Sequence, residues 1–122
     1  MIALGIDLIE VDRIRRSIQS AHFCERVFGA QERQQLAARS MAAESAAACF
    51  AAKEAFGKAL GCGVRGFSLA EVQLLREPSG RPYLSLCGRA LLLAEERGLE
   101  FAVSVTHTKQ YAAVVVAGEK KA

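Results

Sequence analysis

Three charged side chains interrupt an otherwise apolar stretch, Phe50 to Gly61, which reads FAAKEAFGKALG. Its alanines, phenylalanines and leucine are typical of a helix packed against a core, yet Lys53, Glu54 and Lys58 lie in the middle of it. A charge carried into a protein interior costs several kcal/mol unless it is paired or coordinated. These three side chains therefore either reach solvent or bind something.

Glu54 and Lys58 are four residues apart, so their side chains are neighbours on a helix. Ala47, Ala51 and Gly61 share the same stripe and are small enough to let a ligand or another surface approach the helix backbone. A solvated Glu-Lys pair, worth about 0.3 to 0.5 kcal/mol, is the simpler interpretation, and the pattern alone favours it.

Asp7 lies near the end of a short apolar run, IALGIDL, that is typical of a buried strand. An Asp in such a place often serves only as a turn former or a helix cap. Two carboxylates from separate elements are also the usual protein contribution to a Mg²⁺ site, in which water and substrate phosphates fill the other positions. Asp7 and Glu54 are therefore candidate metal ligands, although sequence spacing does not show that they meet.

His107 lies between Thr106 and Thr108 in a short polar loop that separates two β-branched runs. An imidazole in a tight loop is exposed, and the backbone N–H groups beside it can face an anion. A lone loop histidine is more often an ordinary surface residue. Combined with the two acids and Lys58, however, His107 indicates a site for a phosphate and a metal.

The elements that must position these residues follow from apolar periodicity, glycines and turn residues. Strands are predicted at Ile2–Leu8, Leu69–Arg76, Tyr83–Leu86, Phe101–Val105 and Tyr111–Ala117, and helices at Glu10–Ser20, Ala30–Arg39, Ala43–Leu60 and Arg89–Arg97. Strands do not alternate singly with helices, so the pattern predicts an α+β fold. We expect an antiparallel sheet packed with a long central helix and shorter helices.

Length and composition predict one domain at 1–118 with a short basic tail at 119–122. The 122 residues are 52% hydrophobic and 24% charged, and their net charge of +3 suits an acidic partner or a phosphate ligand. The four cysteines form no CxxC pair and no secretory leader precedes them, which predicts free thiols in the cytoplasm. No apolar run reaches the ~18 residues of a membrane span.

Several motifs occur together in a fixed order: GIDLIEVDRI at 5–14, FAAKEAFGKALGCG at 50–63, GRPYL at 80–84 and SVTHTKQYAAVVV at 104–116. In this order and spacing they resemble the holo-[acyl-carrier-protein] synthases, the small-chain bacterial group of the 4′-phosphopantetheinyl transferase superfamily. The resemblance covers nearly the whole chain.

The resemblance implies Mg²⁺-dependent transfer of 4′-phosphopantetheine from coenzyme A to a serine of apo acyl carrier protein, which releases adenosine 3′,5′-bisphosphate. Such a reaction belongs to cytoplasmic fatty acid biosynthesis. The resemblance also implies a homotrimer with active sites between protomers. It implies no nucleic-acid or membrane partner.

Carried over position by position, the resemblance assigns roles to residues of this chain. Asp7 and Glu54 are the implied metal ligands, and Glu54, Lys58 and His107 the implied catalytic residues. The proton of the attacking serine would go to Glu54 or to a metal-bound water. Implied contacts to the coenzyme are Lys58, Gly61, Gly63, Pro82, Thr106 and His107, and those to the carrier protein are Arg13 and Arg26.

One position departs from the family pattern, because an arginine usually precedes FAAKEA and this chain has Cys49 there. A phosphate contact is then missing, for which Lys53, Arg65 or Arg81 could substitute.

Two other classes of protein remain as alternatives. A non-catalytic coenzyme A or nucleotide-binding module would need the phosphate contacts but not both carboxylates. A nucleic-acid-binding domain would need stacking aromatic residues on a strand or a long basic stripe, and the chain has neither.

Overall fold

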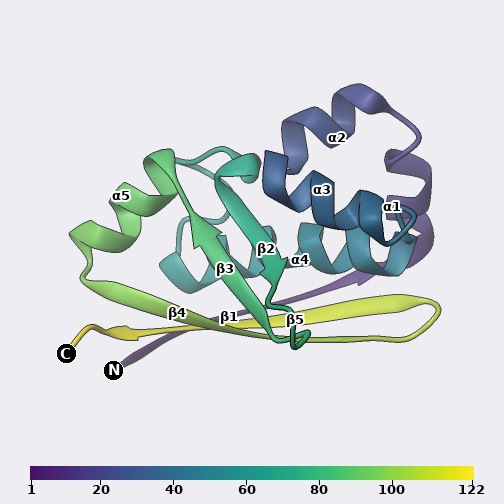
Figure 1. Ribbon diagram of the computed structural model, residues 1–122. Helices are drawn as coiled ribbons and strands as arrows, with labels where there is room; N and C mark the ends of the chain where they lie inside the picture. Colours follow the sequence, from purple (N-terminus) through teal and green to yellow (C-terminus); the bar gives the residue numbers. More distant parts are fainter.

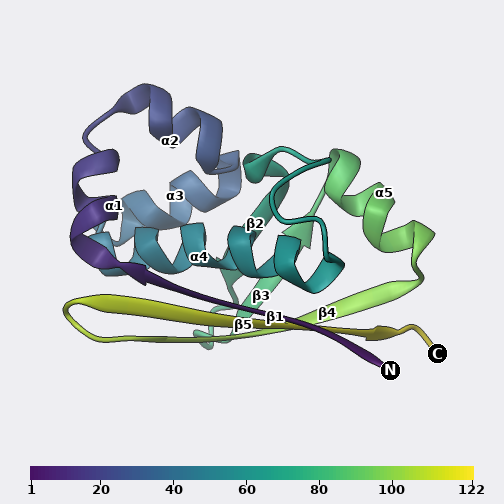
Figure 2. The same ribbon diagram turned by 180° about the vertical axis from the view of Figure 1, so that it is seen from behind.

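A long helix, α4 (Ala43–Leu60), lies across one face of a three-stranded antiparallel sheet in the computed structural model, which describes residues 1–122 (Figures 1 and 2). The strands are ordered β1 (Ile2–Glu10), β5 (Tyr111–Lys120) and β4 (Leu99–His107), so β5 is central and the other two are edges. No helix covers the opposite face of this sheet in either view.

A second sheet consists of the hairpin β2 (Val72–Arg76) and β3 (Pro82–Leu86), which a short 3-10 helix, η1 (Leu69–Glu71), precedes. Helix α5 (Gly88–Glu96) follows the hairpin and lies near the end of the sheet where both chain termini are found (Figure 1). These elements agree with the predicted strands and helix to within a few residues.

Three short helices lie at the other end of the molecule: α1 (Val11–Ser17), α2 (Ala21–Val27) and α3 (Ala30–Ala38). The single helix predicted at Glu10–Ser20 is therefore too long, and α2 was not predicted. The hydroxyl of Ser20 accepts a hydrogen bond from the backbone N–H of Phe23 at 3.2 Å, so Ser20 begins a new helix instead of ending the old one.

The small residues of α4 allow strand β1 to approach the helix backbone. A Cβ atom added to Gly5 would lie 1.9 Å from the Ala55 carbonyl oxygen and 2.7 Å from the Ala59 nitrogen. Both distances are shorter than any van der Waals contact, so only glycine fits at this position. Ala47 and Ala51 have no exposed surface. The stripe of small residues therefore accommodates another surface of the protein, the sheet, along most of its length.

Lys53 is fully buried and binds protein groups. Its ammonium group donates to Glu32 Oε1 at 2.7 Å and to the Val72 carbonyl oxygen, while Glu32 Oε2 accepts from the Leu74 N–H at 2.8 Å. This network connects α4 to α3 and β2. It excludes Lys53 as a substitute for the missing phosphate contact, because the side chain does not reach solvent.

Strand β5 continues two residues into the segment predicted as a tail. Glu119 pairs with Ile2 and Glu100, and Lys120 pairs with Leu99. Only the last two residues lie beyond the sheet, because pairing with two neighbouring strands extends β5 past the apolar run that ends at Ala117. None of the helices has the length and apolar character needed to cross a bilayer.

Replacing Lys53 with Met should destabilise the protein by about 3 to 5 kcal/mol, because the Glu32 carboxylate would remain buried without its cation. The double variant Lys53→Met/Glu32→Gln should recover part of this loss. Urea unfolding measures both. The same substitution at the exposed Lys58, on the same helix, should cost less than about 1 kcal/mol. Equal urea midpoints for Lys53→Met and Lys58→Met would show that the buried pair contributes little.

Candidate active site

Asp7 and Lys58 meet where β1 crosses the last turns of α4. The Lys58 ammonium group donates to Asp7 Oδ1 at 3.2 Å and to the Ile6 carbonyl oxygen at 3.0 Å. Asp7 is half-buried and Lys58 is exposed, so the pair faces solvent at one edge. The alternation of strand side chains, together with the close contact at Gly5, directs Asp7 to the helix face of the sheet.

Glu54 lies one helical turn before Lys58 and is half-buried. The pKa of its carboxyl is raised, first by burial and then by the negative charge of Asp7, while the charges of Lys58 and Arg13 oppose the shift. The two carboxylates are therefore near enough to repel one another. The sequence alone gave no sign that the charge of Asp7 acts on Glu54.

A divalent cation would relieve this repulsion, so the two carboxylates fit the Mg²⁺ ligands that the sequence predicts. The chain has no group of three or more His, Cys, Asp or Glu side chains that could enclose a metal. Mg²⁺ is commonly held by one or two carboxylates, with water and phosphate oxygens completing an octahedron. Asp7 and Glu54 match that pattern, and a fully protein-enclosed metal site does not exist here.

The loop after α4 exposes glycine backbone beside Lys58. Gly61 ends the helix with φ 79° and Gly63 has φ 62°, both in the left-handed region, and a Cβ atom on either would meet nothing within 4 Å. The N–H groups of Cys62 and Gly63 both donate to the Gly57 carbonyl oxygen at 3.1 Å. The loop therefore offers a ligand an open, side-chain-free surface, while these two N–H groups are already used.

His107 lies elsewhere, as the last residue of β4. The prediction that Thr106 and His107 belong to the loop is wrong, because pairing with β5 extends the strand through both residues. His107 lines a shallow depression with Thr108, Lys109, Arg15 and Glu44. Glu44 is in the first turn of α4 and Lys58 in the last, and a rise of 1.5 Å per residue separates them by roughly 21 Å along the helix. Within one chain, the structure thus groups Asp7, Glu54 and Lys58, and places His107 and the adjacent exposed Thr106 near the opposite end of the helix.

A family model described as the 4′-phosphopantetheinyl transferase superfamily matches residues 3–116. The chain belongs to that superfamily. It is 43% identical to a holo-[acyl-carrier-protein] synthase of Treponema denticola over 118 residues, which cover 95% of this chain and 96% of that protein. The prediction of this family, and of a transferase enzyme, is confirmed.

Solved structures of the superfamily share the fold over the whole chain. The complex of Chronobacterium ammoniagenes ACPS with CoA has a TM-score of 0.85 at 26% identity, covering 100% of this chain and 99% of that one. A holo-(acyl-carrier-protein) synthase from Bacillus anthracis, in complex with CoA (3′,5′-ADP), has a TM-score of 0.83 at 30% identity, with 99% of both chains covered. The predicted α+β fold is confirmed.

The two arginines that the superfamily resemblance assigns to the carrier protein are exposed on neighbouring short helices. Arg13, on α1, lies with its guanidinium carbon 5.7 Å from the centre of the Phe50 ring, and its charge acts on Glu54. Arg26 is in the last turn of α2. Pro82, an implied coenzyme contact, is half-buried at the start of β3 and paired with Arg76.

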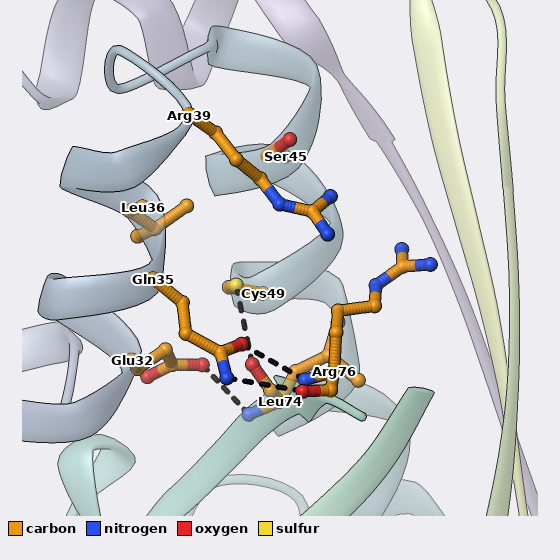
Figure 3. A pocket seen from close by; sticks show the side chains of 8 residues that line it. All are labelled: Glu32, Gln35, Leu36, Arg39, Ser45, Cys49, Leu74 and Arg76. Atoms are coloured by element: carbon orange, nitrogen blue, oxygen red, sulfur yellow. Dashed lines mark hydrogen bonds between the residues drawn. The ribbon is translucent and has the colours of Figure 1, made fainter. Parts of the chain in front are cut away.

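Cys49 faces a pocket that the sequence did not reveal (Figure 3). The Cys49 thiol is buried and lies 3.8 Å from the Leu74 carbonyl oxygen, and burial raises its pKa. Arg39 and Arg76 line the same pocket. Their places in the sequence, at a helix end and before a turn, gave no signal of a shared site. Arg65 and Arg81 are exposed and remain predictions.

Glu54→Gln should make the metal-free protein relatively more stable as pH rises. Because the folded-state pKa of Glu54 is raised, its protonation contributes stability at low pH that is lost as pH rises through that pKa. A neutral Gln loses nothing over this range. Thermal unfolding in EDTA between pH 4 and pH 8 measures the difference between the variant and the parent protein.

The matched control is Glu95→Gln, on the exposed surface of α5 and away from other charges of the site. It should run parallel to the parent protein across the pH range. A pH profile of Glu54→Gln that also runs parallel would contradict the repulsion between Asp7 and Glu54.

Proposed function

We propose that this chain transfers 4′-phosphopantetheine from coenzyme A to a serine hydroxyl of an apo acyl carrier protein, and releases adenosine 3′,5′-bisphosphate. The observation that carries the proposal is the grouping of Asp7, Glu54 and Lys58, in a chain that matches holo-[acyl-carrier-protein] synthases over nearly its full length. Solved relatives described as complexes with CoA support coenzyme A as the donor. We place the reaction in the cytoplasm, within fatty acid biosynthesis.

Asp7 and Glu54 would hold Mg²⁺, which when bound neutralises charge on the diphosphate of the donor. Lys58 is exposed and its ammonium group already lies at the carboxylate pair, so it can contact a diphosphate bound there. Phosphoryl transfer depends mainly on positioning and charge neutralisation. Lys58 is suited to stabilise the phosphate that leaves as the bond opens.

The serine of the carrier protein must lose a proton as it attacks. Glu54 is our candidate for the acceptor, because a hydroxyl is a poor nucleophile until a nearby group takes its proton. The half-buried position of Glu54, one turn from Lys58, keeps it close to the phosphate.

The carrier protein would approach over α1 and α2. Acyl carrier proteins are acidic, and complementary charge mainly sets the rate and orientation of encounter. Arg13 and Arg26 are exposed there, and Arg13 is near enough to Glu54 for its charge to influence that carboxyl. This surface would guide the serine to the carboxylate pair.

We further propose that the chain acts as a homotrimer with active sites between protomers. The uncovered face of the sheet is apolar, with Ile2, Leu4, Ile6 and Leu8 each 59 to 65% exposed on strand β1. Contiguous apolar surface of this kind usually marks an interface. A neighbouring protomer could bring its His107 to the Asp7 and Glu54 of the first, which would explain why one chain separates these residues.

Glu54→Gln should reduce transfer by at least about a hundredfold while the protein remains folded, because both a metal ligand and the proton acceptor are lost. Mass spectrometry of the carrier protein measures the added phosphopantetheine. Glu95→Gln should transfer normally. Near-normal turnover of Glu54→Gln at saturating Mg²⁺ would show that Glu54 takes no part in the reaction. If the carrier protein gains no mass even with the parent enzyme, the chain would instead be a non-catalytic coenzyme-binding module.

Mixed trimers test the site between protomers. Glu54→Gln and His107→Ala should each be nearly inactive alone, yet their co-expressed mixture should regain activity in about a quarter of its sites by random assortment. Mixing Glu54→Gln with Asp7→Asn is the matched control, because those two residues come from the same protomer and no mixed site contains both. Recovery in neither mixture would contradict the shared site.

A further inference from the structure

The pocket beside Cys49 brings together two arginines that come from different elements. Arg39 follows the last residue of α3, and Arg76 ends strand β2. Figure 3 shows their guanidinium groups on the same side of the pocket that Cys49 and Ser45 of α4 also line. The enclosed part is only about 20 Å³, but an open depression of about 440 Å³ adjoins it and shares both arginines.

Arg76 is held firmly in this place. The side-chain amide of Gln35 accepts from the Arg76 N–H at 2.8 Å and donates to the Arg76 carbonyl oxygen at 3.1 Å. The Arg76 guanidinium also donates to the Gly80 carbonyl oxygen at 3.1 Å. One guanidinium is therefore positioned before any ligand arrives, which lowers the entropic cost of binding.

No carboxylate neutralises the two guanidinium groups. Neither Arg39 nor Arg76 takes part in any of the ion pairs of the structure. Glu32 lines the pocket, but its oxygens accept from Lys53, Gly29 and Leu74. Glu77 lines the open depression without pairing with either arginine, so the three groups together carry an excess positive charge.

Burial and the neighbouring charge of Arg39 both lower the pKa of Arg76. An uncompensated pair of like charges is unfavourable, and an anion between them removes the repulsion. Guanidinium groups bind phosphate oxygens through paired N–H donors, which a lysine cannot match.

The residue at position 49 affects how much space the pocket has for the two arginines. The Cys49 side chain is short and ends against the Leu74 carbonyl oxygen. This small thiol leaves room in the pocket for Arg39 and Arg76.

We propose that Arg39 and Arg76 form a phosphate-binding site. The bound group is a phosphate monoester or free phosphate, because two guanidinium groups offer paired N–H donors to its oxygens. It binds in the open depression, since the enclosed cavity is too small for it. The version in which the phosphate belongs to coenzyme A rests on the proposed transfer function. The phosphate site itself does not.

Phosphate binding is measured first, by thermal shift with sodium phosphate titrated against sodium chloride at constant ionic strength. Arg39→Gln should weaken the apparent phosphate affinity at least tenfold. The control Arg33→Gln lies on α3, the helix that Arg39 follows. It removes the same charge and Arg33 does not line the pocket, so it should change the affinity less than twofold. Arg76→Gln should act in the same direction as Arg39→Gln.

Transfer from two donors then identifies the source of the phosphate. If it is the 3′-phosphate of coenzyme A, Arg39→Gln should lower kcat/KM at least tenfold more for coenzyme A than for 3′-dephospho-coenzyme A. If it is a separate phosphate, the two donors should be affected equally while phosphate affinity is still reduced.

Both results support the site. Equal phosphate affinity in Arg39→Gln and Arg33→Gln would overturn it. Absence of transfer by the unmodified protein would instead overturn the proposed function and leave the phosphate measurement intact.

Discussion

The close contact between β1 and α4 is the constraint on which the site depends. Without a side chain at Gly5 and without bulk at Ala55 and Ala59, the strand lies against the helix backbone itself. Asp7, two residues further along the same strand face, then reaches the helix turn that carries Lys58. A larger residue at this crossing would separate the strand from the helix, and the two carboxylates would no longer influence each other.

Two neighbouring residues of α4 show how the same helix serves stability and chemistry. Lys53 is directed to Glu32 and β2 and has no exposed surface, whereas Glu54, rotated by about 100° around the helix, faces Asp7 and solvent. The first charge is neutralised inside the protein. The charge of Glu54 is only partly compensated. Burial and the charge of Asp7 raise its pKa by more than the charges of Lys58 and Arg13 lower it. The fold therefore satisfies one buried charge and keeps the other available for a ligand.

Much of this fold could be predicted from local pattern. The bounds of α4 agree with the prediction because Gly61 adopts the left-handed conformation that ends it. Helix α2 was missed because its seven residues lack apolar periodicity and only Ser20 marks its start. The extension of β5 to Lys120 depends on pairing with β1 and β4, which local sequence does not contain. For the same reason, the ion pair of Lys53 with Glu32 and the pocket shared by Arg39 and Arg76 could be found only from coordinates. Asp7, Glu54 and Lys58 were found through their motifs.

Strand β1 carries polar chemistry on one face and an apolar surface on the other. Asp7 faces α4, and Leu4, Ile6 and Leu8 alternate with it on the uncovered side. Inserting or deleting a single residue within this strand would exchange the two faces. A substitution in this strand alters one face, whereas an insertion or deletion alters both. The number of residues between Gly5 and Val11 therefore decides whether Asp7 can reach Lys58 at all.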